Sequence, residues 1–254
     1  MCKRKNFDVK GCYTQLCRII YNKKIEKDIY LLKTKGKFQG KMGQFYMLKG
    51  WNTLHPILAR PFAIFDIDSH SISFLYKIVG EGTKLLSNLK RDDNIQIMGP
   101  YGNGFPQPEG NIALIGGGMG IAALFLAAKQ LYNNHPVKSL DIFLGFKDKA
   151  ILTDFFQAYT HKLVIDIGNL VSSKIDIYRY DYIFACGPED MIKTLVYKNV
   201  SQKKYKKPRI YISLEKRMAC GVGACLSCSC KTKNGNKLVC KDGPVFPGEN
   251  IVFE

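Results

Sequence analysis

The chain has 254 residues, 46% of them hydrophobic, which is enough for two compact domains or three small ones and argues against disorder. Its nine cysteines form an odd number and no secretory signal is present, which argues against a disulfide framework. The net charge of +17 would suit a nucleic-acid-binding protein, but the basic cluster at residues 203–209 lacks the pattern of a recognition helix or an RNA-binding strand, so we expect a solvated lysine-rich surface and no nucleic-acid partner.

Residues 1–5 are basic, but no apolar segment follows them, so we expect no signal peptide and a cytoplasmic protein. Residues 1–108 then read as short strands rich in β-branched and aromatic residues, separated by glycines and polar turns. The expected strands span 15–21, 29–34, 44–48, 62–67, 71–79 and 94–98, with a helix at 83–89. This pattern predicts an antiparallel β-barrel domain.

Residues 109–208 alternate between strands and helices, which predicts a Rossmann-like α/β domain with a parallel sheet. The expected strands span 112–115, 140–144, 163–166 and 182–185, and the expected helices span 121–132 and 189–200. The longest uncharged stretch, residues 110–128, contains several glycines. A buried strand, loop and helix therefore suit it better than a membrane span, and we expect no membrane association.

Two loops of this domain are candidates for dinucleotide binding. Gly118-x-Gly120-x-x-Ala123, preceded by Gly117, follows a strand and opens a helix, so its backbone could approach a pyrophosphate. A tight turn is the alternative, since no acidic ribose ligand is obvious further along the chain. Cys186-Gly187-Pro188 lies at a strand end, where such folds bind ligands. Its alternative is a strand end followed by the first residue of a helix.

Residues 209–254 form a small third domain rich in glycine and cysteine, with short strands expected around 238–239 and 251–253. Cys220, Cys225, Cys228 and Cys240 have the C-x4-C-x2-C…C spacing of plant-type [2Fe–2S] ferredoxins. Structural zinc and inert thiols are the alternatives, although zinc sites usually show two separated Cys-x2-Cys pairs or histidines. We expect Cys230 to be a packing residue.

Further motifs carry a family resemblance through nearly the whole chain. The quoted stretches are Arg60-Pro61-Phe62-Ala63, Leu75-Tyr76-Lys77, Gly80-x-Gly82-Thr83, the turn at residues 99–105, and residues 215–228 with 240–246. With the order barrel, nucleotide sheet and cysteine motif, the chain resembles the ferredoxin–NADP reductase superfamily. Within it, the chain resembles the electron-transfer subunits of NAD-dependent dihydroorotate dehydrogenases of class 1B.

The resemblance implies an oxidoreductase subunit with three bound groups. Residues 60–63, 75–77, 82 and 83 would bind FAD, the glycine and cysteine loops would bind NAD, and the four cysteines would hold a [2Fe–2S] cluster. Ala63 replaces a serine of the family motif, so one hydroxyl contact to the flavin ring is lost. Lys77 replaces an arginine, which keeps the positive charge near a phosphate but loses the bidentate hydrogen bonds.

The resemblance also implies a partner. Electrons would pass from an FMN-containing catalytic subunit, which oxidises dihydroorotate in pyrimidine biosynthesis, through the cluster and FAD to NAD+. Two catalytic and two electron-transfer subunits would form the complex, in contact through the cluster domain. The alternatives are the flavin and iron–sulfur subunit of an NADH-dependent ferredoxin:NADP oxidoreductase, and a basic zinc-binding module without redox function.

Overall fold

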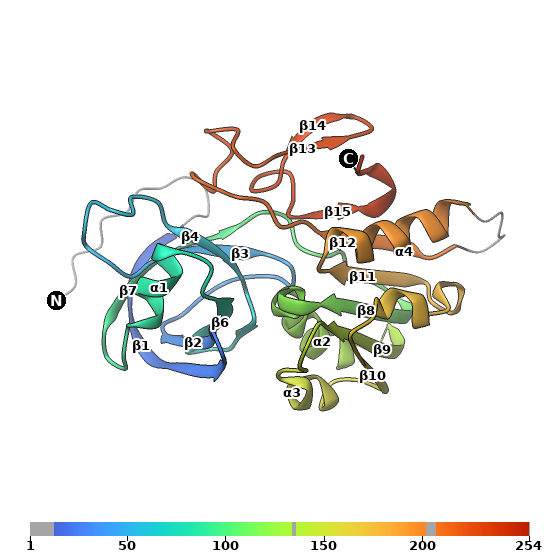
Figure 1. Cartoon of the computed structure of the whole chain (residues 1–254), viewed down its shortest axis with the longest axis horizontal. Coiled ribbons are helices and arrows are strands. Elements are labelled where there is room, and N and C mark those ends of the chain that lie inside the picture. The colour runs from blue at the N-terminus through green and yellow to red at the C-terminus, as the bar shows by residue number, and fades with distance from the viewer. Residues whose placement is uncertain (1–12, 134–135, 202–206, 254) are drawn as a thin grey trace.

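The computed structural model describes residues 13–133, 136–201 and 207–253, and Figure 1 shows two sheets with a loop-rich cysteine segment above them. None of the helices in these ranges is long and apolar enough to cross a bilayer. The basic amino terminus and residues 203–206 of the basic cluster lie outside the described residues. The fold is multidomain, with an antiparallel β part and an α/β part, as the sequence predicts.

The first sheet is an antiparallel barrel with the strand order β4-β3-β7-β1-β2-β6-β5. The chain between residues 62 and 67 forms two strands rather than the single expected one. β4 pairs with β3, and after Ile64 and Phe65 the chain pairs with β6 instead, so the two ends of the sheet are consecutive in sequence. Helix α1 (Glu81–Ser87) follows β6. The strands are β1 (Tyr13–Glu26), β2 (Ile29–Lys35), β3 (Phe45–Lys49), β4 (Arg60–Ala63), β5 (Asp66–Ile67), β6 (Ser71–Lys77) and β7 (Asn94–Tyr101).

The second sheet has the order β10-β9-β8-β11-β12-β15, and β15 alone is antiparallel to its neighbour among these described strands. Its strands are β8 (Gly110–Gly117), β9 (Val137–Phe146), β10 (Lys162–Ile167), β11 (Tyr182–Cys186), β12 (Arg209–Ser213) and β15 (Val245–Pro247). Its helices are η1 (Gly118–Ala123), α2 (Phe125–Tyr132), α3 (Thr153–Gln157), η2 (Val171–Lys174), η3 (Ile177–Arg179) and α4 (Glu189–Ser201).

The central strand β8 is buried on both faces, which explains its uninterrupted apolar sequence. Ile112 and Leu114 share one hydrophobic core with α2, whereas Ala113 and Ile115 share another core with α4. Because side chains alternate along a strand, the two helices cover opposite faces of the sheet (Figure 1). The expected helix at 121–132 starts as a 3₁₀ turn, and its α-helical part begins only at Phe125.

The cysteine segment is attached to the second sheet at both ends, by β12 before it and β15 after it. Between them lies the hairpin of β13 (Ser229–Thr232) and β14 (Gly235–Leu238). The strand expected at 251–253 is wrong, because Ile251 forms only an isolated bridge to Thr232 after the turn η4 (Gly248–Asn250). The domain limits at 108/109 and 208/209 stay predictions.

The two sheets meet through an aromatic contact and an ion pair. The rings of Phe65 and Phe125 stack with centroids 4.5 Å apart, and Lys129 Nζ lies 2.8 Å from Asp66 Oδ1. Phe65 follows β4 and Asp66 opens β5, while Phe125 and Lys129 belong to α2. The partner switch that ends β4 therefore also supplies the contact that joins the barrel to the second sheet.

Candidate functional site

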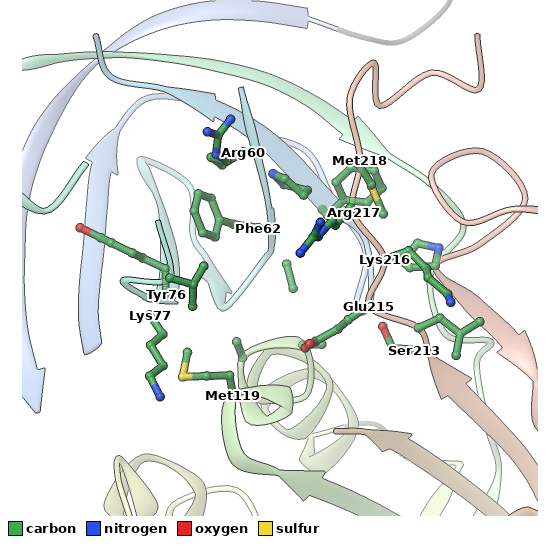
Figure 2. A pocket seen from close by; sticks show the side chains of 18 of the residues that line it. Arg60, Phe62, Tyr76, Lys77, Met119, Ser213, Glu215, Lys216, Arg217 and Met218 are labelled. Atoms are coloured by element: carbon green, nitrogen blue, oxygen red, sulfur yellow. The ribbon is translucent and has the colours of Figure 1, made fainter. Parts of the chain in front are cut away.

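A cavity of about 920 Å³, here called the barrel cavity, lies between the barrel, η1 and the segment after β12 (Figure 2). Its volume is in the range of sites that bind drug-sized ligands and cofactors. It gathers most of the residues that the motifs suggested for a flavin. These are Arg60, Pro61, Phe62, Ala63, Leu75, Tyr76, Lys77, Thr83 and, from the nucleotide loops, Cys186.

The barrel wall of the cavity is aromatic. Tyr76 on β6 stacks on Tyr30 of β2 at 5.6 Å between ring centroids, and the ring of Phe62 on β4 lies 5.5 Å from that of Tyr76. The hydroxyl of Tyr76 donates to Asn22 Oδ1 at 3.0 Å, and burial raises the pKa of this phenol. A rigid aromatic wall of this kind suits a planar ring system.

The edge of the cavity near α1 is positively charged. Arg60 lies over the ring of Trp51 and donates from Nη1 to the carbonyl of Leu58 at 2.5 Å. A Cβ on Gly82 would lie 2.6 Å from Arg60 Nε, so a glycine at this position leaves room for the arginine side chain. Gly82 does not line the cavity itself. The Thr83 hydroxyl donates to the carbonyl of Gly80 at 2.8 Å and fixes the turn before α1. With Lys77, this edge suits a phosphate.

The opposite wall pairs the buried thiol of Cys186 with the carboxylate of Glu215, a contact that the sequence did not indicate. The thiol of Cys186 lies 3.9 Å from Glu215 Oε1, and Figure 2 shows the Glu215 carboxylate directed into the cavity. Burial, reinforced by the negative charge of Glu215, raises the pKa of the Cys186 thiol well above its ordinary value. Burial also raises the pKa of Glu215. Cys186 is therefore a neutral thiol at physiological pH and not a thiolate nucleophile.

A second cavity of about 680 Å³, here called the glycine-loop cavity, contains the other predicted nucleotide residues: Gly117, Gly118, Gly120, Gly187 and Pro188. The two loops approach each other backbone to backbone. A Cβ on Gly120 would collide with the carbonyl of Cys186, and one on Gly187 would lie 2.8 Å from Gly117 Cα. Both cavities are lined by Met119, Leu214, Glu215 and Lys216. The two cavities therefore adjoin at these four side chains, and ligands bound in them would meet there.

The cysteine loop, residues 218–228, has no helix or strand and surrounds its sulfurs with backbone N–H groups. Cys220 Sγ accepts from the N–H groups of Val222 at 3.4 Å, Ala224 at 3.2 Å and Cys225 at 3.5 Å. The N–H of Gly223 donates to Cys240 Sγ at 3.1 Å. Gly221 and Gly223 have φ values of +74° and +80°, which favour glycine.

The four thiols interact as two pairs. Partial burial raises the pKa of Cys220, but N–H groups of the loop and the Cys225 thiol outweigh it and lower the pKa to about 6. Burial, then the neighbouring Cys228 thiol, raises the pKa of Cys240 to about 12. Among the described residues, no three Cys, His, Asp or Glu side chains converge on one ion position. Two pairs of thiols match a centre in which four cysteines hold two irons.

Cys230 belongs to β13, is buried and lines the glycine-loop cavity. Sequence periodicity could not separate it from Cys228, since both would face the same side of an extended strand. The structure separates them by hydrogen bonding, because Cys228 Sγ accepts from the N–H of Cys240 at 3.4 Å.

Comparisons with known proteins agree with this geometry. Residues 215–252 match the family model described as the iron-sulfur cluster binding domain of dihydroorotate dehydrogenase B. The dihydroorotate dehydrogenase B (NAD(+)) electron transfer subunit of Clostridium acetobutylicum is 42% identical over 245 residues, covering 93% of this chain and 96% of the relative. That of Clostridium perfringens is 39% identical, covering 91% and 95%. The chain belongs to the family of dihydroorotate dehydrogenase B electron transfer subunits.

Solved structures add the fold of this family. The structure of an NADH-dependent reduced ferredoxin-NADP oxidoreductase superposes with a TM-score of 0.81 at 27% identity, covering 94% of this chain and 90% of the other. A ferredoxin NADP+ reductase from Neisseria gonorrhoeae with bound FAD and NADP gives a TM-score of 0.63 at 14% identity, covering 78% and 97%. The chain therefore has a ferredoxin reductase-like fold.

Proposed function

We propose that the chain is the electron-transfer subunit of an NAD-dependent dihydroorotate dehydrogenase, which delivers to NAD+ the electrons that a separate subunit removes from dihydroorotate in pyrimidine biosynthesis. One observation carries the proposal beyond family membership. Ala219 and Ser227, which flank the cysteines, line the barrel cavity, and Glu215 and Lys216 line both cavities. The three predicted binding sites are thus contiguous.

The barrel cavity would hold FAD. Phe62 and Tyr76 offer apolar aromatic surface to a ring, while Arg60 and Lys77 offer positive charge to a pyrophosphate. Ala63 removes one hydroxyl donor, but Arg217, which Figure 2 shows directed into the cavity, brings a further donor group to it. When bound, the flavin exchanges hydride with nicotinamide and single electrons with a cluster.

The glycine-loop cavity would admit NAD. Gly118 leaves the backbone open to a dinucleotide, whereas Gly117, Gly120 and Gly187 allow the two loops to lie against each other. Cys186, which precedes Gly187, lines the barrel cavity. Its neutral thiol offers a small, uncharged contact to a ring placed between the two cavities.

Cys220, Cys225, Cys228 and Cys240 would be the ligands of the [2Fe–2S] cluster. The N–H groups of Val222, Gly223, Ala224 and Cys225 already donate to two of these sulfurs. Such donors stabilise thiolate charge and tune the potential of a bound cluster. A reducing compartment such as the cytoplasm would keep the thiols available for iron.

The family name implies a catalytic partner subunit, since these proteins are electron transfer subunits of dihydroorotate dehydrogenase B. We propose further that the partner carries FMN and that two copies of each subunit form the complex. The two cavities described above suit FAD and NAD, which supports a separate subunit for dihydroorotate oxidation.

Anaerobic reconstitution tests the function. The chain should purify with iron and flavin, and adding dihydroorotate together with the catalytic subunit should bleach the flavin and reduce NAD+. A preparation with neither iron nor flavin, or flavin that stays oxidised under these conditions, would contradict the proposal. The likeness to the NADH-dependent reduced ferredoxin-NADP oxidoreductase supports a second candidate of that class. That candidate predicts bleaching by reduced ferredoxin or NADPH and none by dihydroorotate.

A further inference from the structure

The glycine-loop cavity has a wall that the nucleotide loops do not supply. Besides residues 117–120, 187 and 188, its lining includes part of the hairpin β13–β14 and the end of the chain after η4. These residues are Ser229, Cys230, Lys231, Asn236, Ile251, Val252 and Phe253. Figure 1 shows the hairpin above β12 and β15. The cysteine segment therefore helps to shape the dinucleotide cavity, a role that the glycine motif does not indicate.

Lys231 and Asn236 occupy paired positions of this hairpin. They are register partners in the antiparallel ladder of β13 and β14, so their side chains leave the same face of the hairpin. The turn beyond them is ordered, because the Thr232 hydroxyl donates to the carbonyl of Gly235 at 2.6 Å and Gly235 has a φ of +87°, which favours glycine. Both Lys231 and Asn236 are exposed and both line the cavity. The hairpin thus brings an ammonium group and an amide group to one place.

The charge of the cavity suits a pyrophosphate. Lys216 and Lys231 are the cations among the described residues that line it, and Glu189 and Glu215 are the acids. Glu189 Oε1 is paired with Lys193 Nζ at 2.8 Å. Figure 2 shows the Glu215 carboxylate directed into the barrel cavity and Lys216 on the other side of the segment. The two acids therefore do little to offset the two lysines that line the glycine-loop cavity, and an anionic group would be attracted there.

Cys228 and Cys240, two of the proposed iron ligands, fix the base of the hairpin. Cys228 directly precedes β13, and Cys240 lies two residues after β14. The N–H of Val239 donates to the carbonyl of Cys228 at 3.1 Å, and the N–H of Cys240 donates to Cys228 Sγ at 3.4 Å. A two-stranded hairpin is only marginally stable by itself in water, so its attachments decide where its face lies. Iron bound by these cysteines would hold Lys231 in position.

We infer that Lys231 and Asn236 bind the pyrophosphate of the dinucleotide, and that the iron ligands Cys228 and Cys240 hold the hairpin where it can do so. The inference rests on the proposed function, which assigns NAD to this cavity and iron to the cysteines. A glycine loop at a helix start places a pyrophosphate against its backbone, and a lysine adds a charge-assisted hydrogen bond. Iron occupancy and dinucleotide affinity are then coupled through the hairpin.

Lys231→Gln tests the contact, and Lys233→Gln is the matched control. Lys233 lies in the turn of the same hairpin, is exposed and does not line the cavity. Each variant is loaded with FAD and iron and titrated in the oxidised state with NAD+ and with ADP-ribose by calorimetry. Lys231→Gln should bind both ligands about tenfold more weakly, and Lys233→Gln should stay within about twofold of the parent. Asn236→Ala, which removes a neutral donor, should weaken both by about threefold. Flavin and iron spectra show that each variant is folded.

A second titration tests the attachment of the hairpin to the iron ligands. The parent and Lys231→Gln are prepared with FAD alone and titrated with the same two ligands. The iron-free parent should lose about as much affinity as Lys231→Gln loses with iron present. Removing iron from Lys231→Gln should weaken binding little further, because the contact is already absent and the two changes act on one interaction. Unchanged flavin absorbance shows that the barrel is intact in both.

Three results would overturn the inference. One is a parent chain that binds NAD+ while Lys231→Gln binds it equally well. Another is a loss of affinity for NAD+ with none for ADP-ribose, because the contact would then lie at the nicotinamide. The last is a pair of losses, from the substitution and from iron removal, that simply add. A loaded parent chain that binds neither ligand would instead refute the proposed dinucleotide site, and the inference with it.

Discussion

The barrel cavity and the cysteine loop prepare for their ligands in opposite ways. The cavity is walled by β4, β6 and η1, whose side chains are held by aromatic stacking and by hydrogen bonds such as Tyr76 to Asn22. The cysteine loop has no helix or strand, and N–H donation to sulfur supplies much of its order. The cavity is shaped by its own side chains, whereas we expect the cysteine loop to gain stability from bound iron.

Because of this difference, we expect the loss of iron and the loss of flavin to be independent events. Loss of iron removes the attraction that balances four neighbouring sulfurs, so the loop loosens while the barrel keeps its core. Loss of flavin leaves a preformed cavity that rebinds its ligand at little conformational cost.

Replacing Cys225 with serine breaks the cysteine loop alone. Cys225→Ser should abolish electron transfer from dihydroorotate to NAD+, because serine is a poor ligand for iron, and should keep NADH oxidation by a two-electron acceptor. Iron content, the visible spectrum and the two activities measure this. Cys17→Ser is the control, since Cys17 is a buried cysteine of the barrel strand β1. Undiminished coupled turnover in Cys225→Ser would show that the loop is not on the electron path.

Replacing Arg60 with alanine breaks the barrel cavity alone. Hydrogen bonds to charged groups contribute about 1.5–3 kcal/mol, so Arg60→Ala should weaken FAD binding by about tenfold to a hundredfold. The FAD affinity of Arg60→Lys should lie between those of the parent and Arg60→Ala, because lysine keeps the charge but cannot make the two parallel hydrogen bonds of arginine. Fluorescence titration of flavin-free protein gives the affinities. Iron content should not change, and a parallel loss of iron would contradict the independence of the sites.

Glu215 lines both cavities, and we expect it to make the free energy of unfolding depend on pH. Burial raises its folded pKa above the ordinary value of 4.5, so folding favours the protonated form. The contribution of Glu215 to stability is therefore fully present below pH 4.5 and is lost as pH rises through the folded pKa. Flavin-free Glu215→Gln should match the parent at low pH and exceed it at about pH 8, as urea unfolding would show. An equal difference at both pH values would point to packing instead of charge.

The smallest effect concerns the ion pair between the barrel and α2. Lys129 and Asp66 are each partly exposed, so Lys129→Met should change the free energy of unfolding by less than about 1 kcal/mol. The stacked pair of Phe65 and Phe125 should keep the two sheets together. A much larger loss in urea denaturation would mean that this ion pair, and not the aromatic contact, joins the two parts.

Local patterns predicted the elements whose partners are close or whose burial is complete. The apolar strand β8, the glycine loop and the cysteine spacing could all be recognised from short stretches, because buried parallel strands and ligand spacings have characteristic sequences. The break between β4 and β5 could not be recognised. Ile64 and Phe65 continue an apolar run, and only the change of partner from β3 to β6 separates the strands.

The missed site residues share another cause. Glu215 belongs to a charged stretch that lies on the surface, and its contact with Cys186, which is distant in sequence, is visible only in the fold. Likewise, β12 joins the parallel sheet through pairing with β11, although its sequence opens the cysteine segment. Such long-range pairing has no signal within the segment itself. The alternating apolar residues of β12, Ile210 and Ile212, indicate a strand but not the strand with which it pairs.

The pairing of β12 with β15 has a consequence for an apoprotein. Residues 214–244, which include all four proposed ligands, form a closed loop whose two ends stay joined when iron is absent. The entropy of bringing those ends together has already been lost, and it grows only slowly with loop length. Reassembly around iron therefore searches a confined set of chain conformations, and we expect such a loop to be refilled repeatedly without unfolding the rest of the protein.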